Sequence, residues 1–336
     1  MSRKAALRDS TGAEHAGILG VGAYRPRRVV SNAEICERID SSDEWIQTRS
    51  GIKNRRFAEP DETVAMMSVA AGGKALAAAG VRADEVGCVI VATVSHLLQT
   101  PSVAAAVAEE LGTRPAAAFD VSAACAGFCY GVALANDMVR GGSATYALVI
   151  GVERLSDLLD REDRATAFIF ADGAGAVLIG PTERPGIGPV VWGADGSQYD
   201  LIRQKETWSD VFASADHEWP NLTMQGAPVF RWASFEMAKV AGEALDRAGI
   251  SVDDLDVFVP HQANMRITDA MARALKLPSS VRIARDIAEQ GNTSAASVPL
   301  ALDTMLSTGQ AKSGETALLI GFGAGLTYAA QVVVLP

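Results

Sequence analysis

GGKALAAAGVRADEVGCVIV at residues 72–91 aligns without a gap to AGEALDRAGISVDDLDVFVP at residues 241–260, at an offset of 169 residues. Each copy reads as an apolar-periodic helix, then a glycine, a short acidic loop and a β-branched strand. The paired glycines, Gly80 and Gly249, stand where a helix commonly ends in a left-handed cap. One helix–loop–strand unit therefore occurs twice in the chain.

A second echo shows that the duplication covers more than one unit. ALVIGV at residues 147–152 resembles ALLIGF at residues 317–322, at an offset of 170. Strands and helices alternate in each half, and the continuously apolar strands fit a sheet buried on both faces. We therefore expect an α/β fold of two related halves packed together. Because Pro and Gly cluster in ERPGIGP, we place the boundary there and predict halves 1–184 and 185–336.

Composition restricts the class of protein. The 336 residues are 49% hydrophobic and 21% charged, which is typical of a soluble globular chain of about two structural units. The net charge of −10 disfavours a general nucleic-acid binder. No apolar run reaches the ~20 residues that span a bilayer, and Met1–His15 lacks an apolar signal core. Four cysteines are too few for a disulfide scaffold, so we expect a cytoplasmic protein and no membrane.

Cys125 is a candidate nucleophile. It lies in FDVSAACAGFCYG, where a strand ends, small residues turn, and a helix begins. A thiol at a helix N-terminus faces the positive end of the helix dipole, so we expect its thiolate to be favoured. The small neighbours leave room for a substrate. The local pattern alone favours a cysteine that packs as a small apolar group.

Two further candidates, His261 and Asn292, lie at the end of a strand and in a turn, where ligands commonly bind in α/β sheets. His261 follows the strand DVFVP, and Asn292 lies in the Gly–Asn turn of EQGNTSAAS. Taken locally, His261 could be structural and Asn292 could be a helix cap. No Cys/His spacing predicts a metal site.

Two glycine-rich segments, DGAGAVLIG at 172–180 and GFGAGLTYAA at 321–330, lack both the dinucleotide spacing and a Walker lysine. We interpret each as a tight turn whose backbone N–H groups could stabilise an oxyanion. Residues 200–226 form a long polar stretch, which we interpret as a surface insertion.

Taken together, the motifs are more specific than each alone. AACAGF around Cys125, VPHQANMRI around His261 and GNTSAASVPLAL around Asn292 resemble β-ketoacyl-acyl carrier protein synthase III, an initiating condensing enzyme of the thiolase-like superfamily. SSDEWIQTRSGI at 41–52, DGAGA and GFGAGLTY also fit, and the resemblance runs from about Gly17 to Pro336. It implies the duplicated five-layered α/β/α/β/α fold, in agreement with the repeat.

The resemblance also implies roles for individual residues. Cys125, His261 and Asn292 would form the catalytic triad, and the backbone N–H groups of Cys125 and Ala324 would form the oxyanion hole. Many relatives have glycine where this chain has Ala324. The remaining positions implied by the resemblance are Trp45, Arg49, Arg164, Phe230 and Asn264 for coenzyme A, Thr100 for the acyl pocket, and Arg231, Arg266 and Arg273 for docking of the carrier protein.

The implied reaction is the decarboxylative condensation of a short-chain acyl-coenzyme A primer with malonyl-acyl carrier protein, which initiates type II fatty acid synthesis. The resemblance implies that no metal or redox cofactor is needed. It also implies a homodimer, in which the loop bearing Thr100 reaches the acyl pocket of the other subunit. Some relatives carry a bulky aromatic residue at this position. We therefore expect Thr100 to leave room for branched or longer primers.

Other enzymes and a non-enzyme remain as alternatives. Thiolases use a second cysteine in the C-terminal half, whereas every cysteine here lies at or before Cys129. Elongating ketosynthases use Cys-His-His, and Asn292 stands in the third position here. Plant-type polyketide synthases share Cys-His-Asn, as do papain-like proteases, which the duplicated strand–helix pattern opposes. A starter-unit ketosynthase or acyltransferase of a specialised polyketide pathway is the alternative function. A non-catalytic partner subunit would usually lack the cysteine.

Overall fold

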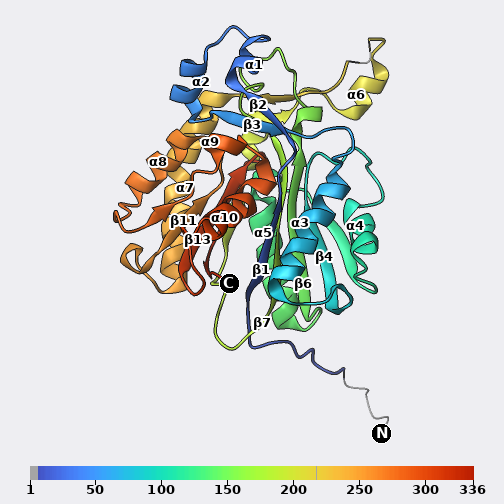
Figure 1. The fold of residues 1–336 in the computed structure, drawn as a ribbon, viewed down its shortest axis with the longest axis vertical. Helices are drawn as coiled ribbons and strands as arrows, with labels where there is room; N and C mark the ends of the chain where they lie inside the picture. Colours follow the sequence, from blue (N-terminus) through green and yellow to red (C-terminus); the bar gives the residue numbers. More distant parts are fainter. Residues whose placement is uncertain (1–6, 217) are drawn as a thin grey trace.

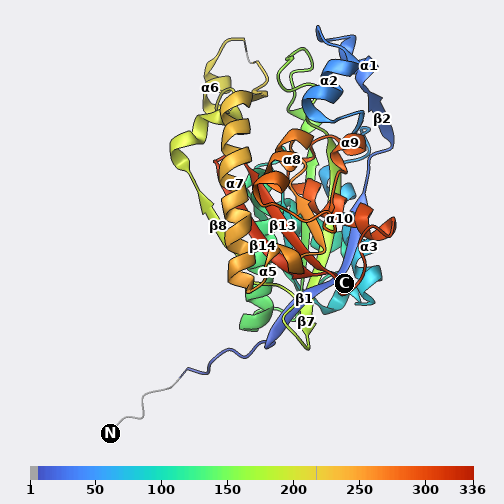
Figure 2. The same cartoon turned by 90° about the vertical axis from the view of Figure 1, so that its left-hand side faces the viewer.

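The computed structural model describes residues 7–216 and 218–336, and within them two five-stranded sheets form the framework (Figures 1 and 2). The first sheet has the order β1-β7-β6-β4-β5. Its strands are β1 (His15–Tyr24), β4 (Val86–Ala92), β5 (Ala117–Val121), β6 (Tyr146–Arg154) and β7 (Asp172–Thr182). Its helices are α3 (Val64–Ala79), α4 (Val103–Leu111) and α5 (Gly127–Gly141).

The second sheet has the order β8-β14-β13-β11-β12. Its strands are β8 (Val191–Ala194), β11 (Val257–Pro260), β12 (Arg282–Ile283), β13 (Thr316–Gly323) and β14 (Thr327–Val334). Its helices are α7 (Gly226–Ala248), α8 (Met265–Ala274) and α10 (Ser297–Ser307).

The two sheets have the same topology. In the first sheet, β1–β7 and β7–β6 pair antiparallel, and β6–β4 and β4–β5 pair parallel. In the second sheet, β8–β14 and β14–β13 pair antiparallel, and β13–β11 and β11–β12 pair parallel. Strand β13 thus takes the place in the second sheet that β6 takes in the first. The duplication expected from the sequence repeat is confirmed at the level of strand order and direction.

The layers follow from which faces of the helices are apolar. Helices α3 and α4 cover the outer face of the first sheet, and α7 and α8 cover the outer face of the second (Figure 1). Helices α5 and α10 lie between the sheets, in a core that contains side chains from both halves. The expected five-layered α/β/α/β/α fold is therefore confirmed.

The repeated segment folds as its sequence predicts. Helix α3 ends at Gly80 with φ +66°, and α7 ends at Gly249 with φ +73°. A left-handed cap of this kind suits glycine because glycine has no Cβ to clash. Short 3₁₀ turns, η1 (Ala83–Glu85) and η5 (Val252–Asp254), then lead into β4 and β11.

The segment at 172–180 corrects one expectation, because it is not a turn. It forms most of strand β7. Its small residues instead allow α10 to approach, since a Cβ on Gly175 would lie 2.7 Å from the Pro299 side chain. The regularly spaced glycines in this segment therefore indicate close packing of β7 against α10. The second glycine-rich segment does turn, between β13 and β14.

Smaller elements surround the end of the sheets that carries the candidate residues. They are β2 (Arg28–Ser31), α1 (Asn32–Cys36), α2 (Asp43–Ser50), β3 (Asn54–Phe57), η3 (Leu155–Asp157), η4 (Gly196–Leu201), β9 (Ile202–Gln204), α6 (Trp208–Ala213), β10 (Leu222–Met224) and α9 (Ile287–Gln290). The expected insertion at 200–226 falls on β9, α6 and β10, and much of it is exposed.

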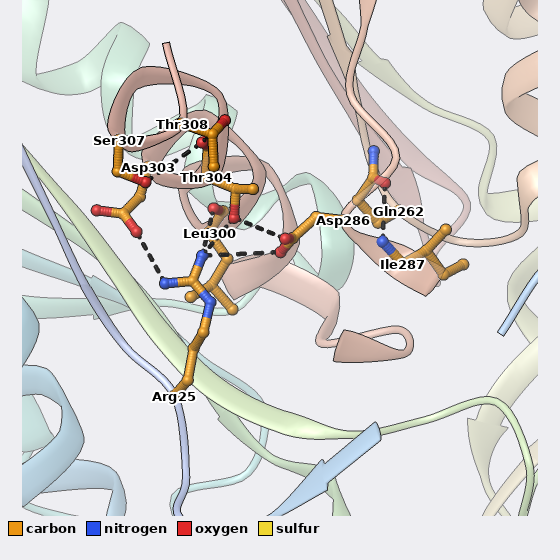
Figure 3. A network of polar contacts seen from close by, with 9 residues as sticks. All are labelled: Arg25, Gln262, Asp286, Ile287, Leu300, Asp303, Thr304, Ser307 and Thr308. Atoms are coloured by element: carbon orange, nitrogen blue, oxygen red, sulfur yellow. Dashed lines mark hydrogen bonds and ion pairs between the residues drawn. The ribbon is translucent and has the colours of Figure 1, made fainter. Parts of the chain in front are cut away.

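Arg25, just after β1, ties the first half to the second (Figure 3). Its guanidinium lies 2.8 Å from the Asp303 carboxylate and donates to the Leu300 carbonyl and the Thr304 hydroxyl of α10. Thr304 in turn donates to Asp286 at 2.7 Å. This network fixes α10 and the start of α9 against the first sheet.

Candidate active site

Two cavities meet at Cys125. The entrance cavity has a volume of about 510 Å³ and is lined by Cys125, His261, Asn292 and ten or more residues from α2, α7 and α8. The inner cavity, of about 1070 Å³, is lined by the loop after β4 and by residues 202–222, and it also contains Cys125. The sulfur therefore stands where a ligand in one cavity could pass a group into the other.

The turn that carries Cys125 is tightly constrained. Cys125 lies in η2 (Ala124–Ala126), directly before α5, and is 8% exposed. Ala124 has φ +45°, a left-handed conformation that costs free energy for a residue with a Cβ. Gly323 of β13 lies against the thiol, because a Cβ there would be 2.8 Å from the Cys125 sulfur. The backbone of both halves thus fixes the position of the sulfur.

The expectation of a favoured thiolate is wrong for the free site. Burial, with a smaller contribution from the nearby charge of Glu153, raises the pKa of the Cys125 thiol to about 12. Interactions with the Ser294 side chain and with the Cys125 backbone N–H lower this pKa but do not offset burial. Desolvation outweighs the helix N-terminus, so the free site holds a neutral thiol at neutral pH.

His261 follows β11 and is buried, with 2% of its surface exposed. Its Nδ1 lies 2.6 Å from the Ser297 hydroxyl, and its ring meets Phe322 edge-on at 5.3 Å. Burial lowers the pKa of His261 to about 3, so the ring is neutral. If Ser297 donates to Nδ1, the single ring proton resides on Nε2, which makes Nε2 a hydrogen-bond donor.

Asn292 presents the same kind of donor. Its backbone N–H bonds the Ile169 carbonyl at 2.9 Å, and its carbonyl accepts from Ala171. Its side-chain oxygen accepts from the Ser294 N–H at 2.9 Å. Because this oxygen is occupied, the amide nitrogen is the end of the side chain left to donate into the entrance cavity.

Two backbone amides complete the surroundings of the sulfur. Within the described residues, the Ala324 N–H donates to no backbone or side-chain acceptor, and the Cys125 N–H interacts with its own sulfur. Thr327 holds the turn by donating to the carbonyls of Ala324 and Ala123, at 2.9 and 3.0 Å. Ala324 does not have a positive φ, so alanine fits this position without backbone strain.

The turn of Cys125 has a counterpart in the second half. Residues 294–296 form η6 (Ser294–Ala296), which leads into α10 as η2 leads into α5. Ser294 has φ +47°, which matches the φ of Ala124. The same turn is therefore built twice, once around the thiol and once beside Asn292.

Each turn rests on a glycine of the other half. A Cβ on Gly151 of β6 would lie 2.2 Å from the carbonyl oxygen of Ala295 in η6. A Cβ on Gly321 of β13 would lie 2.8 Å from the carbonyl oxygen of Cys125. The central strand of each sheet thus supports the turn contributed by the opposite half.

Aromatic and cationic side chains form the mouth of the entrance cavity. Trp45 of α2 has the Arg164 guanidinium 4.7 Å from its ring centroid and that of Arg49 at 5.8 Å. Phe168 packs edge-on against Trp45 at 5.3 Å. The three residues predicted for this part of the site therefore lie together, and Phe168 joins them.

The opposite wall comes from α7 and α8. Phe230 lies 5.0 Å below the Arg266 guanidinium. Asn264 caps α8 by accepting from the Arg266 N–H, and it donates to the Arg49 carbonyl at 2.9 Å. Asn264 thus also joins α2 to α8, a role that the sequence motif did not reveal. Arg231 lines the same cavity and is exposed.

Two of the predicted residues line neither cavity. Arg273 is exposed in the last turn of α8, one residue before the helix ends. Thr100 is exposed on the loop after β4, whereas its neighbours Gln99 and Ser102 line the inner cavity. In a single chain Thr100 therefore lies outside the acyl pocket, and its reach into another subunit stays a prediction.

The structure adds residues that the motifs did not single out. Ser297 orients His261, and Ser294 donates its N–H to the Asn292 side chain and its hydroxyl to Glu153. Both serines occur in GNTSAASVPLAL, so their hydroxyls could have been considered. Glu153 is fully buried beside them, and its position directly after the strand ALVIGV made it look like an ordinary polar end of a strand.

The described residues contain neither a group of metal ligands nor a membrane-spanning helix. No three His, Cys, Asp or Glu side chains in them gather as metal ligands. No helix in residues 7–216 or 218–336 is both long and apolar enough to cross a membrane.

Known protein families match both parts of this site. Residues 119–196 match the family model for 3-oxoacyl-[acyl-carrier-protein] synthase III, and residues 245–335 match the model for its C-terminal part. The chain is 60% identical to β-ketoacyl-[acyl-carrier-protein] synthase III of Streptomyces glaucescens, covering 98% of this chain and 99% of that one. It is 54% identical to the mycobacterial enzyme of Mycobacterium avium, over 97% and 98% of the two chains.

Solved structures give the same result. The priming β-ketosynthase of the R1128 polyketide pathway superposes with a TM-score of 0.96 at 48% identity, covering 98% of each chain. The 3-oxoacyl-[acyl-carrier-protein] synthase III of Aquifex aeolicus superposes with a TM-score of 0.88 at 36% identity, over 95% and 99%. The chain therefore belongs to the β-ketoacyl-[acyl-carrier-protein] synthase III family, and it is an acyl-transferring enzyme.

Proposed function

We propose that this enzyme condenses a short-chain acyl-coenzyme A primer with malonyl-acyl carrier protein, giving 3-oxoacyl-acyl carrier protein for type II fatty acid synthesis. The observation that carries this proposal is the meeting of one thiol and two neutral side-chain donors, Cys125, His261 and Asn292, in one cavity. Identity of 60% to named enzymes of this family supports it.

In the first half-reaction, Cys125 attacks the thioester carbonyl carbon of the primer. The negative charge that develops on the carbonyl oxygen is stabilised by the N–H groups of Cys125 and Ala324. Coenzyme A leaves, and the acyl group remains on the sulfur. The inner cavity, with its apolar wall, receives the acyl chain.

In the second half-reaction, loss of carbon dioxide from the malonyl group leaves an enolate. Nε2–H of His261 and the Asn292 amide donate to the enolate oxygen. A neutral donor suits this task because burial holds the pKa of His261 at about 3, so no buried positive charge is needed. The carbanion then attacks the acyl group on Cys125, and the sulfur is released.

The entrance cavity would hold the carriers of both substrates. Trp45, Arg49 and Arg164 bind the nucleotide end of coenzyme A, and Phe230 and Asn264 line the path of the pantetheine arm. Exposed Arg231, Arg266 and Arg273 form the surface for the acidic acyl carrier protein, which the net charge of −10 would otherwise repel.

We further propose a homodimer, in which the loop bearing Thr100 borders the inner cavity of the other subunit. Leu97 and Leu98 of this loop are 47% and 58% exposed in the single chain, which suits residues that await a second subunit. Thioester exchange and loss of carbon dioxide drive the reaction, so we expect it to proceed without a metal or redox cofactor.

The experiment that tests the proposal is to map the acyl-enzyme. We expect labelled acetyl- or isobutyryl-coenzyme A to modify Cys125 alone, as read by mass spectrometry of the digested protein. Cys129, buried one helical turn away, is the matched control, so Cys129→Ala keeps the label and Cys125→Ala loses it. Label on any other residue, or none, would exclude this function.

A second candidate rests on the solved structure with a TM-score of 0.96, which is a priming ketosynthase of a polyketide pathway. The chemistry at Cys125 is the same in both candidates, and they differ in the carrier protein that accepts the product. Turnover with the carrier proteins of both pathways distinguishes them, because the preferred partner should give the higher kcat/KM.

A further inference from the structure

The proposed mechanism leaves one proton without an acceptor. Cys125 enters the reaction as a thiol, and it must lose its proton as the sulfur attacks the thioester. His261 cannot take this proton while Nδ1 accepts from Ser297 and Nε2 carries the hydrogen needed as a donor. A doubly protonated ring would place a cation in a site that is 2% exposed. Another group must receive the proton.

Glu153 lies at the carboxyl end of β6, close enough to Cys125 for its charge to raise the pKa of the thiol. Its side chain is fully buried, and four donors from two segments converge on it. Oε2 accepts from the Ser95 hydroxyl at 2.6 Å, the Val94 N–H at 3.1 Å and the Thr93 hydroxyl at 3.3 Å. Oε1 accepts from the Ser294 hydroxyl at 3.0 Å. Of these donors, only Ser294 belongs to the second half of the chain.

Ser294 connects this carboxylate to the thiol. Its hydroxyl donates to Glu153, and the turn that carries it, η6, packs against η2, the turn that carries Cys125. Ser294 and Cys125 line the same inner cavity. The serine is held there in a left-handed conformation, φ +47°, and strain of this kind is retained where the surrounding structure needs the residue in place.

From this arrangement we propose that Glu153 receives the thiol proton of Cys125 through the hydroxyl of Ser294. The inference rests on the proposed role of Cys125 as the acyl acceptor. As the S–C bond to the primer forms, the thiol proton moves to the Ser294 oxygen and the Ser294 proton moves to Oε1 of Glu153. When the bond from carbon to the coenzyme A sulfur breaks, the leaving thiolate takes one proton back by the same route. Glu153 is then again a carboxylate, and no further reactant is needed.

The electrostatic surroundings suit a carboxylate that gains and loses a proton. Burial raises the pKa of Glu153 to about 7, although its hydrogen bonds lower it. Near the end of β6, the paired strand β7 contributes Asp172, and η2, which packs against η6, contributes Cys125. The Asp172 carboxylate is bonded to Ser156 and to the Ala58 N–H, and Arg154 pairs with Asp157 at 3.0 Å. No described cation pairs with Glu153.

Glu153 does not touch the sulfur, so it is a positioning residue that acts through Ser294. The test is the pH profile of the acylation of Cys125 by radiolabelled acetyl-coenzyme A in single turnover. In the unmodified enzyme, the rate should rise as pH passes through about 7 and then level off. In Glu153→Gln this limb should disappear, and the rate at pH 7.5 should fall at least about 100-fold, the usual scale of general-base catalysis.

Three variants separate the relay from a general loss of structure. Ser294→Ala removes the connecting hydroxyl and should lose the same limb, and Ala124 shows that alanine tolerates this backbone conformation. Glu153→Asp keeps the carboxylate and should restore part of the limb. Asp172→Asn neutralises another buried carboxylate of the same half and should keep the limb.

The relay is overturned if Glu153→Gln and Ser294→Ala keep the pH limb, or if Asp172→Asn loses it equally. It is also overturned if removal of the Glu153 charge accelerates acylation. The unmodified enzyme distinguishes failure of the relay from failure of the proposed function, because only the latter would leave Cys125 unlabelled. Should Glu153→Gln not fold, Ser294→Ala decides the outcome alone.

Discussion

Replacing Trp45 by alanine tests whether the mouth of the entrance cavity binds a nucleotide. A base that stacks on an aromatic ring gains about 1–3 kcal/mol. In the free enzyme the Arg164 guanidinium already lies 4.7 Å from the Trp45 ring, and an adenine entering between them must displace a contact of about 0.5–1 kcal/mol. The net loss in Trp45→Ala is therefore about 0.5–2 kcal/mol, which is a roughly 2- to 30-fold weaker binding of acyl-coenzyme A.

The assay compares two primers, acetyl-coenzyme A and acetyl-pantetheine, in the acylation of Cys125. Acetyl-pantetheine lacks the adenine nucleotide, so its KM should be the same for Trp45→Ala and the unmodified enzyme. The KM for acetyl-coenzyme A should rise roughly 2- to 30-fold, with kcat nearly unchanged because the sulfur and its donors are untouched.

Trp192 supplies a matched control for this substitution. It is 42% exposed and packs on Tyr130 at 5.2 Å, but it lines neither cavity. Trp192→Ala should leave both KM values unchanged. If Trp45→Ala weakens both primers equally, the tryptophan supports the fold of α2 and does not contact the nucleotide, and the reasoning is refuted.

Three further predictions concern the donors, the acyl pocket and acid stability. In His261→Ala and Asn292→Ala, labelled acyl transfer to Cys125 should persist, while the rate of malonyl decarboxylation should fall about 100-fold or more. Complete loss of labelling in both variants would contradict the assignment of these residues to the second half-reaction. Thr100→Phe should lower the ratio of isobutyryl- to acetyl-coenzyme A turnover, and an unchanged ratio would place this residue away from the primer. Because burial lowers the pKa of His261 from 6.5 to about 3, the unfolded chain binds a proton that the folded chain does not. Stability therefore falls with pH below 6.5, and urea unfolding should show the unmodified enzyme losing about 2 kcal/mol relative to His261→Gln between pH 7 and pH 5; parallel pH dependences would show that this ring is charged when folded.

Much of the fold was predictable because both halves of the sequence contain the same pattern of helices and strands. The two copies of the helix–glycine–strand unit gave the strand order its symmetry, and Gly80 and Gly249 ended their helices as expected. The segment 172–180 was wrongly predicted as a turn, because a glycine in a strand and one in a loop look alike in sequence. Only the packing of Pro299 against Gly175 distinguishes them.

The site was predictable in its residues and less so in its electrostatics. Nothing in their spacing places Cys125, His261 and Asn292 together, and it was the resemblance to a known family that grouped them. The helix N-terminus predicted a low pKa for the thiol, but that reasoning is local. Burial depends on residues from both halves, and it raises this pKa to about 12. For the same reason Glu153 gave no signal, since its partners Ser95 and Ser294 lie far from it in sequence.

The exchanged supports beneath the two turns make the halves mutually dependent. Gly151 of the first half packs beneath the turn beside Asn292, and Gly321 of the second half packs beneath the turn that carries Cys125. Each half therefore supports a reactive residue that belongs to the other half. A chain cut between 184 and 185 would yield two fragments, neither with a properly seated turn. Such fragments should be inactive alone and should recover activity only when they reassemble. By the same reasoning, an ancestral protein with a single copy of the unit would have needed to dimerise to position these turns.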